Sequence, residues 1–356
     1  MKSLFSIPKA KIMIGLLIGI GLLVLVSRFV NLSFTLHVLQ HNLATPRGLI
    51  LALLSGIAFL SAFSVRGIRW KLFLNPVGNV STFTAIRLFF ISIFINFLLP
   101  ISSGEIAKSL MLKRTLAIPI SRSLPTVAMD RSMDLLPALF IIIIVPFLGI
   151  QMDIKLWLVL GTVASLLICL ILFVGLAAWK RDAAITLLSK ITAMLPKTYG
   201  SKITDFATGF VETLLNGIRR PKIFIPALLL TCIAVIFDSL FALFAFWTIG
   251  FPISFGTAIF GYTVFNMFFI LPTPPGQLGS NEAVGLLVFT GLLRLPPSKV
   301  TAMIIFSHPW AALLMCTAGI ISLKALGLTI ATAMRGQPEE SEEALLPEIE
   351  ETPALY

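Results

Sequence analysis

Charged residues are scarce in this chain. Only 12% of its 356 residues are Asp, Glu, Lys or Arg, whereas soluble globular domains carry about 25%. Hydrophobic residues make up 57%, and the mean hydropathy is +1.00. This balance excludes a soluble globular protein. The apolar runs are continuous over about 20 residues, which excludes a transmembrane barrel, whose strands alternate over about 10. The expected fold class is all-α, a polytopic helical membrane protein.

Cysteine and histidine are also rare, with three of each. The cysteines lie in three separate apolar runs and the histidines form no local ligand cluster, so we expect neither disulfide bonds nor a metal site. The sequence has no Walker loop, glycine-rich dinucleotide turn or nucleophile elbow. We therefore expect no cofactor and no ATP-driven transport by this chain alone.

Positive charges exceed negative ones, and the formal net charge is +11. In a soluble protein this excess would suggest a nucleic-acid partner. Here most of the cationic residues flank apolar spans, where lysine and arginine are expected at a membrane surface. We therefore expect membrane lipids as partners and no nucleic acid.

The apolar pattern is interrupted within two helical segments. The first interruption follows the apolar run from Leu88 to Leu99, where Pro100, two serines and Gly104 precede Glu105 before apolar residues resume. Asn96 lies one helical turn before the proline. Proline and glycine break a helix and let backbones approach, so this pattern is typical of a membrane helix that breaks partway across.

The second interruption repeats this order. An apolar helix containing Asn266 reaches Leu271 and is followed by prolines, glycines and then Glu282. The helix-breaking residues of this segment are Pro272, Pro274, Pro275, Gly276 and Gly279. One interrupted helix in each half of a chain is the pattern of transporters whose binding site lies near the bilayer midplane. We therefore predict two re-entrant hairpins that are related as inverted repeats.

The chain divides into one transmembrane domain, 1–337, and an acidic tail, 338–356, that is expected to be disordered. Within the domain, an amphipathic linker, 179–222, joins a first half, about 1–178, to a second half, 223–337. Uninterrupted spans are expected at residues 12–26, 48–65, 125–149, 156–178, 223–249 and 300–330.

The distribution of cationic residues predicts the orientation. With a cytoplasmic N-terminus, and with each hairpin returning to its own side, about 21 of the 27 lysines and arginines face the cytoplasm. Residues 66–71, with two arginines, a tryptophan and a lysine, are interpreted as an interfacial anchor on that side. We predict an inner (plasma) membrane protein with both termini in the cytoplasm. The first hairpin then enters from the cytoplasm and the second from outside.

Six ionisable residues lie in or beside apolar segments: Glu105, Lys108, Asp130, Arg131, Asp134 and Glu282. A charge at mid-membrane costs about 2.5–3.5 kcal/mol on insertion scales, so six unpaired charges would exceed a typical domain's net stability. They must be paired, protonated or hydrated. For Arg131 two interpretations stay open. It forms an internal ion pair with the neighbouring aspartates, or it reaches Glu105 or a bound anionic headgroup, onto whose phosphate a guanidinium forks with two hydrogen bonds.

The two glutamates that follow the breaks also allow two interpretations. Each caps the second half-helix of its break, or it carries a proton or binds a cationic group. Asp238, alone in an apolar span, and His308 either belong to a proton path or hydrogen-bond to a neighbouring carbonyl group. The predicted headgroup path comprises Glu105, Lys108, Arg131, Asp134 and Glu282.

Together these motifs resemble the flippase-like transmembrane family, the membrane region shared with lysylphosphatidylglycerol synthases. The resemblance covers nearly the whole chain except the acidic tail. It rests on Asn96 to Pro100 with Gly104, Glu105 and Lys108, on Asp130 and Arg131 with Asp134, and on residues 274–279 with Glu282. The family commonly has arginine where Lys108 stands and glycine where Gln277 stands. No aminoacyl-transfer domain follows the membrane region in this sequence, so lysyl transfer is not the expected activity.

The resemblance implies a flippase-like protein that translocates a lipid or lipid-linked headgroup between leaflets. Two alternatives stay open. One is a membrane-embedded enzyme acting on a lipid headgroup, with Glu105 and Glu282 as acid and base. The other is a non-catalytic membrane partner whose acidic tail docks a soluble enzyme. An enzyme changes the mass of its lipid, whereas a flippase changes only the leaflet.

Overall fold

The computed structural model describes residues 32–99, 103–134, 220–268 and 273–330, together with a few isolated positions between 17 and 165. These residues form helices and contain no strand, so the expected all-α class is confirmed. In chain order the elements are α2 (Leu32–Leu43), α3 (Pro46–Leu74), α4 (Thr82–Leu98), α5 (Ser103–Leu116), α6 (Ile120–Met133), α11 (Pro221–Thr248), α12 (Phe255–Phe268), the 3₁₀ helix η2 (Pro275–Gln277), α13 (Ser280–Gly285), the π-helix η3 (Leu286–Leu292) and α14 (Pro297–Ala325).

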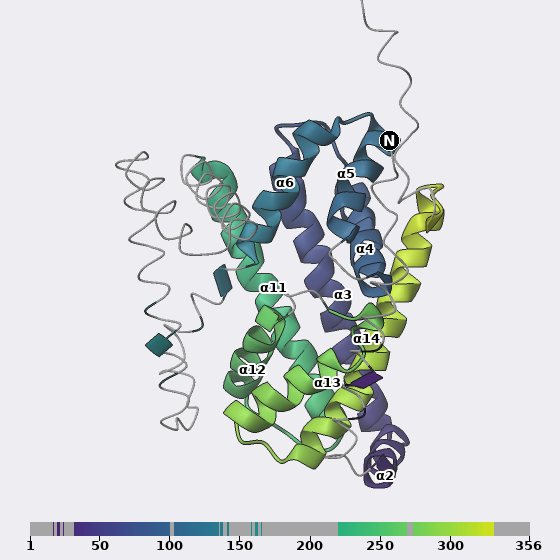
Figure 1. Cartoon of the computed structure of the whole chain (residues 1–356), viewed down its shortest axis with the longest axis vertical. Coiled ribbons are helices and arrows are strands. Elements are labelled where there is room, and N and C mark those ends of the chain that lie inside the picture. The colour runs from purple at the N-terminus through teal and green to yellow at the C-terminus, as the bar shows by residue number, and fades with distance from the viewer. Residues whose placement is uncertain are drawn as a thin grey trace, which may run out of the picture.

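Among the described residues, three long apolar helices, α3, α11 and α14, run through the molecule (Figure 1), and each is long and apolar enough to cross a membrane. α3 and α11 pack along each other at its centre. The spans expected at 223–249 and 300–330 correspond to α11 and α14, which begin slightly earlier, at Pro221 and Pro297, because proline fits the first turn of a helix. Many large apolar side chains on these three helices face outward, as contact with lipid requires.

α3 is longer than the span expected at 48–65. Thr45 caps its start, since the Thr45 Oγ1 accepts a hydrogen bond from the Gly48 N–H (3.0 Å), and the helix continues to Leu74. The interpretation of residues 66–71 as an interfacial anchor is therefore wrong for Arg69 and Trp70, whose side chains are buried. α4 and α6 pack against α3 and cover this part of it.

Both interruptions separate two packed helices. α4 ends at Leu98 and α5 begins at Ser103, and the two helices contact each other, as do α12 and α13. η2 contacts α4, and the rings of Phe97 and His308 meet edge to face with centroids 6.4 Å apart. The two breaks therefore meet inside the molecule. α4, α5 and α6 lie toward one end of the long helices, and α12 and α13 toward the other (Figure 1).

The apolar core follows this division. One cluster packs α3, α4 and α5 around Trp70 and Ile91. A second packs α11, η3 and α14 around Phe246 and Phe289. Between them, side chains of α3, α11 and α14 form a third cluster that includes Met315. The long helices thus join two cores, and the breaks lie between the cores.

Several expectations lie wholly or mostly outside the described residues. They concern Pro100, Pro272, the spans 12–26 and 156–178, the linker 179–222 up to residue 219, and the tail 338–356. The span expected at 125–149 is described mainly through α6, which begins earlier, at Ile120, and ends at Met133. Asp130 and Arg131 lie in the last turn of α6, and Asp134 is its C-cap residue. The re-entrant hairpins and the inverted repeat remain predictions.

Candidate functional site

Asn96 links the two sides of the first break. Its Oδ1 accepts a hydrogen bond from the Gly104 N–H (2.7 Å), and its Nδ2 donates to Glu105 Oε1 (3.2 Å). The amide therefore caps the first turn of α5, where backbone N–H groups lack partners within the helix. A Cβ on residue 104 would lie 2.0 Å from the Ser92 carbonyl oxygen, so glycine is needed for this approach of α5 to α4.

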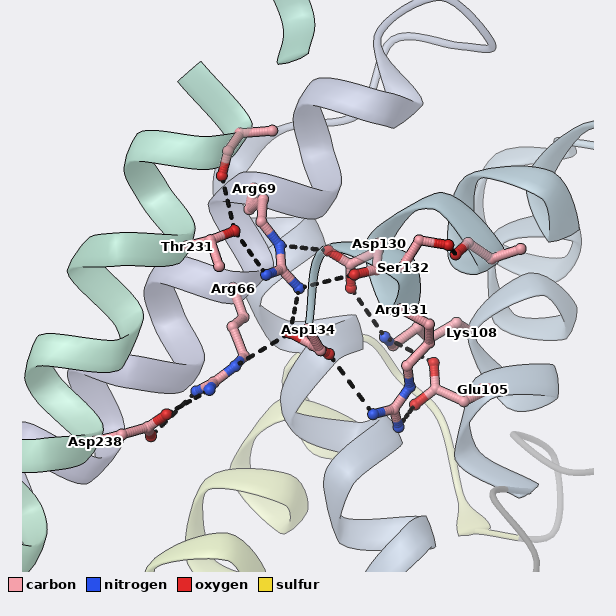
Figure 2. A network of polar contacts seen from close by, with 12 residues as sticks. Arg66, Arg69, Glu105, Lys108, Asp130, Arg131, Ser132, Asp134, Thr231 and Asp238 are labelled. Carbon is pink, nitrogen blue, oxygen red and sulfur yellow. Dashed lines mark hydrogen bonds and ion pairs between the residues drawn. The ribbon is translucent and has the colours of Figure 1, made fainter. Parts of the chain in front are cut away.

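Arg69 is the centre of a network of ion pairs that joins α3, α5, α6 and α11 (Figure 2). Its side chain is 1% exposed and makes four hydrogen bonds. Nε donates to Asp130 Oδ1 (2.8 Å), and Nη2 donates to Asp134 Oδ1 (2.8 Å) and to the Asp130 carbonyl (3.0 Å). Nη1 donates to Thr231 Oγ1 (3.0 Å). A buried guanidinium is tolerated only when its donors are used in this way.

Arg66 extends the network by one turn along α3. Its guanidinium donates two parallel hydrogen bonds to the carboxylate of Asp238 on α11, and its Nε lies 3.7 Å from Asp134 Oδ1. Such a two-bond fork is the strong geometry for an arginine and a carboxylate. Asp238 was a candidate for a proton path, and the structure places it in this ion pair (Figure 2).

Lys108 is buried within the network. Its Nζ is 3.0 Å from Glu105 Oε2 and 3.7 Å from Asp130 Oδ2, and its side chain is 1% exposed. The ammonium group also lies over the ring of Phe89 at 4.0 Å, a favourable cation–π contact. Lys108 is therefore a buried partner of Glu105, and its place in the predicted headgroup path stays a prediction.

Arg131 is the accessible cation of the network. Its Nη2 donates to Glu105 Oε1, its Nη1 lies 3.7 Å from Asp134 Oδ2, and 49% of its side chain is exposed. Of the partners that the sequence suggested, Arg131 thus contacts Asp134, the residue after its own helix, and also Glu105, and the headgroup contact stays a prediction. It is the network cation best placed to exchange a protein carboxylate for a ligand.

The described network is balanced in charge. Four cationic side chains, Arg66, Arg69, Lys108 and Arg131, face four carboxylates, Glu105, Asp130, Asp134 and Asp238. Sequence reasoning missed the two arginines of α3. The sequence did contain a signal for them. The apolar segments that form the network carry four carboxylates, but sequence reasoning assigned only two cations, Lys108 and Arg131, to the same segments. Two further cationic partners therefore had to come from the end of another helix.

The second break contains several residues with positive φ. Gly276 has φ +65°, Gln277 +56° and Gly279 +74°, in the left-handed region that glycine occupies readily. Pro274 and Pro275 precede them, and Pro275 takes the first position of η2. These residues turn the chain between α12 and α13.

His308 ties this second break to α14. Its Nδ1 lies 2.7 Å from Glu282 Oε1 and its Nε2 lies 2.9 Å from the Gly276 carbonyl oxygen. The imidazole therefore connects three elements, namely α14, α13 and η2. Of the two open interpretations, the contact with a neighbouring carbonyl group is present, and the partner carboxylate was not foreseen.

A cavity of about 260 Å³ lies where the two breaks meet. Its charged lining residues are Arg66, Arg69, Glu105, Arg131, Asp134 and Asp238, all members of the network. On the side of the second break the polar lining residues include Asn266, Gln277 and His308. Phenylalanines of α3 and α4 supply apolar walls. Glu282 is not a lining residue and contacts the cavity wall through His308.

The donor chemistry of the site suits polar and ionic groups. Within the described ranges, no three His, Cys, Asp or Glu side chains gather so as to hold a metal ion. The network carboxylates are instead each close to an arginine or lysine. Three arginines and three carboxylates facing one small cavity can bind a group that bears a phosphate, an amine or both.

The family model for the lysylphosphatidylglycerol synthase transmembrane region matches residues 12–319, which is most of the chain. The chain belongs to this family. The resemblance seen in the sequence is thereby confirmed, and membership makes the protein a multi-pass membrane protein linked to lipid headgroup handling. Comparisons with curated proteins and with solved structures gave no match.

Proposed function

We propose that this protein moves the headgroup of a membrane lipid between the two leaflets. The observation that supports this function is the cavity between the two breaks, with three arginines and three carboxylates in its lining. A polar headgroup enters this cavity while the acyl chains stay in the bilayer. Family membership, which links the chain to lipid headgroup handling, supports the same class of substrate.

Arg131 is the proposed contact for a lipid phosphate. A guanidinium binds phosphate through two parallel hydrogen bonds, and this one is half exposed. Its present partner, Glu105, has a second cation at hand, because Lys108 Nζ lies 3.0 Å from Glu105 Oε2. When a phosphate takes the place of Glu105 on Arg131, Glu105 keeps Lys108 and is not left as an unpaired buried charge. In the absence of a headgroup, Glu105 thus serves as the anionic partner of Arg131.

The proposed transport cycle uses the two halves of the molecule. The helices beside the first break and those beside the second lie toward opposite ends of α3, α11 and α14 (Figure 1). Rocking of one group against the other exposes the cavity alternately to each side, as in transporters built from inverted repeats. A plasma-membrane location with both termini in the cytoplasm is part of this proposal.

The enzymatic alternative finds less support in the geometry. Glu105 is engaged by both Arg131 and Lys108, an arrangement that holds a carboxylate in its charged form rather than leaving it to exchange a proton. The partner-protein alternative depends on the tail 338–356, so removal of the tail tests it. A translocase keeps its activity without the tail.

The test uses the purified full chain in liposomes with several labelled phospholipids, scored for leaflet accessibility and, by mass spectrometry, for chemical change. We expect movement without a change in mass. Arg131→Gln and Glu105→Gln should each lower the rate at least tenfold, because each removes one side of the exchangeable pair. Lys113→Gln, which neutralises an exposed cation at the far end of α5, serves as the matched control and keeps the rate. A change in lipid mass would move the assignment to an enzyme.

A further inference from the structure

The contacts of His308 fix the number of protons that it shares with Glu282. A carbonyl oxygen only accepts hydrogen bonds, so the Nε2 that lies 2.9 Å from the Gly276 oxygen carries a hydrogen. One further hydrogen must lie between Nδ1 and Glu282 Oε1, which are 2.7 Å apart. Either the ring or the carboxyl group supplies it. A neutral histidine beside an ionised glutamate holds one proton too few for both contacts.

The second oxygen of the same carboxyl group supports this count. Glu282 Oε2 is buried and has no hydrogen-bond partner among the described residues. An ionised carboxylate without the extra proton would face the lone pair of Nδ1 with one oxygen and have no donor at the other. The geometry is that of a pair that has already bound its proton.

From this we propose that Glu282 and His308 form a proton-binding site whose occupancy fastens the second break to α14. When the proton leaves, the N–H bond at Nδ1 or the O–H bond at the carboxyl group breaks, its electrons stay on the protein, and the proton passes to water. The remaining ring hydrogen serves one contact only. Either Glu282 on α13 or the Gly276 carbonyl of η2 then loses its bond to His308.

The release acts on η2 and α13, the two elements that His308 contacts. Both are short, and Gln277, the last residue of η2, and Gly279, the residue before α13, have positive φ. η2 also contacts α4 beside the first break, and His308 lines the cavity. Loss of the proton therefore loosens one wall of the cavity. Resting on the proposed function, this step would couple lipid movement to a proton gradient.

The other charged groups around His308 are accounted for on each neighbouring element. Among the described residues that share the cavity, α3 contributes Arg66 and Arg69, α11 contributes Asp238, and α12 contributes Tyr262. α5 and α6 contribute the remaining charged lining residues, Glu105, Arg131 and Asp134. All of these except Tyr262 are paired within the balanced network. Glu282 is the ionisable group in direct contact with the imidazole.

The proton site can be tested without any lipid assay. The chain has three histidines, so ¹⁵N-histidine labelling of the full chain in liposomes gives few signals, and His308→Gln identifies the one of interest. In the wild type the His308 signals and the carboxyl infrared band of Glu282 should change together as pH rises. In Glu282→Gln the amide N–H donates to Nδ1, so both contacts persist with a neutral ring and the signals stay constant over that range. A His308 titration that Glu282→Gln leaves unchanged would overturn the proton site.

The coupling is tested in liposomes that contain the labelled phospholipids and a trapped pH dye, which reports the internal pH. The quantity measured is the rate of lipid movement as a function of pH. The wild-type rate of lipid movement should change by up to about tenfold per pH unit across the titration of the pair. Glu282→Gln should lose this dependence, and His41→Gln, at an exposed position of α2, should keep it. Equal pH dependence in wild type and Glu282→Gln would refute the coupling. If the wild type moves no lipid at any pH while the spectroscopic pair titrates as expected, the proposed function fails and the proton site stands.

Discussion

Arg69 shows how a charged side chain is held inside this helix bundle. Its four hydrogen bonds reach Asp130, Asp134 and Thr231, which belong to two other helices. Such a pair adds little net stability compared with apolar packing, but removal of one partner leaves an uncompensated buried charge. Loss of an ion-pair partner should therefore be costly at Arg69. It should cost less at Arg131, because water can solvate the half-exposed side chain.

We expect Arg69→Met to destabilise the protein by about 3–5 kcal/mol, because Asp130 is left buried without its main partner. The double substitution Arg69→Met with Asp130→Leu should recover part of that loss. Lys113→Met, at an exposed position, should change the stability by less than about 0.5 kcal/mol. Unfolding of the purified protein in detergent measures all three. An Arg69→Met variant as stable as the wild type would contradict the structural role of Arg69.

At the scale of elements, proline and glycine made both breaks predictable. The contacts of the side chains around the breaks were harder to predict. The sequence showed where α4 must end, because Pro100 follows Leu99. It did not show that the Asn96 amide bridges to Gly104 and Glu105, since that contact depends on how closely α5 returns along α4. For Glu105 the sequence allowed two interpretations. The structure places it in the first turn of α5 and also in ion pairs with Arg131 and Lys108.

Gln277 occupies a backbone conformation that suits glycine. It has φ +56° and lies between Gly276 and Gly279 in the chain. A non-glycine residue in this region costs about 1 kcal/mol, so Gln277→Gly should stabilise the protein by about that amount. Gln277→Ala keeps the Cβ and removes the rest of the side chain, so it should give no such gain. Thermal unfolding of the two variants separates the backbone effect from the side-chain effect, and equal gains would point to the side chain.

At the scale of the whole molecule, composition and apolar periodicity predicted the helical membrane fold and the positions of α11 and α14. They failed at the end of α3, because a lysine- and arginine-rich helix end looks the same whether it meets water or a ring of carboxylates. Arg66 and Arg69 can be told apart from interfacial anchors only once α6 and α11, which supply their carboxylate partners, are placed beside them. Burial of Trp70 has the same cause, since α6 supplies Thr126 as its hydrogen-bond partner.

The inverted arrangement is tested by single cysteines in a variant whose three native cysteines are serine. Arg47 and Ser298 lie in the first turns of α3 and α14, whereas Lys113 and Lys324 lie in the last turns of α5 and α14. All four positions are exposed. The first turns of α3 and α14 lie toward one end of the molecule, and the last turns of α5 and α14 lie toward the other (Figure 1). Because most cationic residues are assigned to the cytoplasm, we expect an impermeant thiol reagent to label positions 113 and 324 from the cytoplasmic side, and 47 and 298 from the outside. Labelling of 47 and 113 from the same side would mean that the helix pair α4 and α5 does not return to the cytoplasm, and the two halves would then not be inverted.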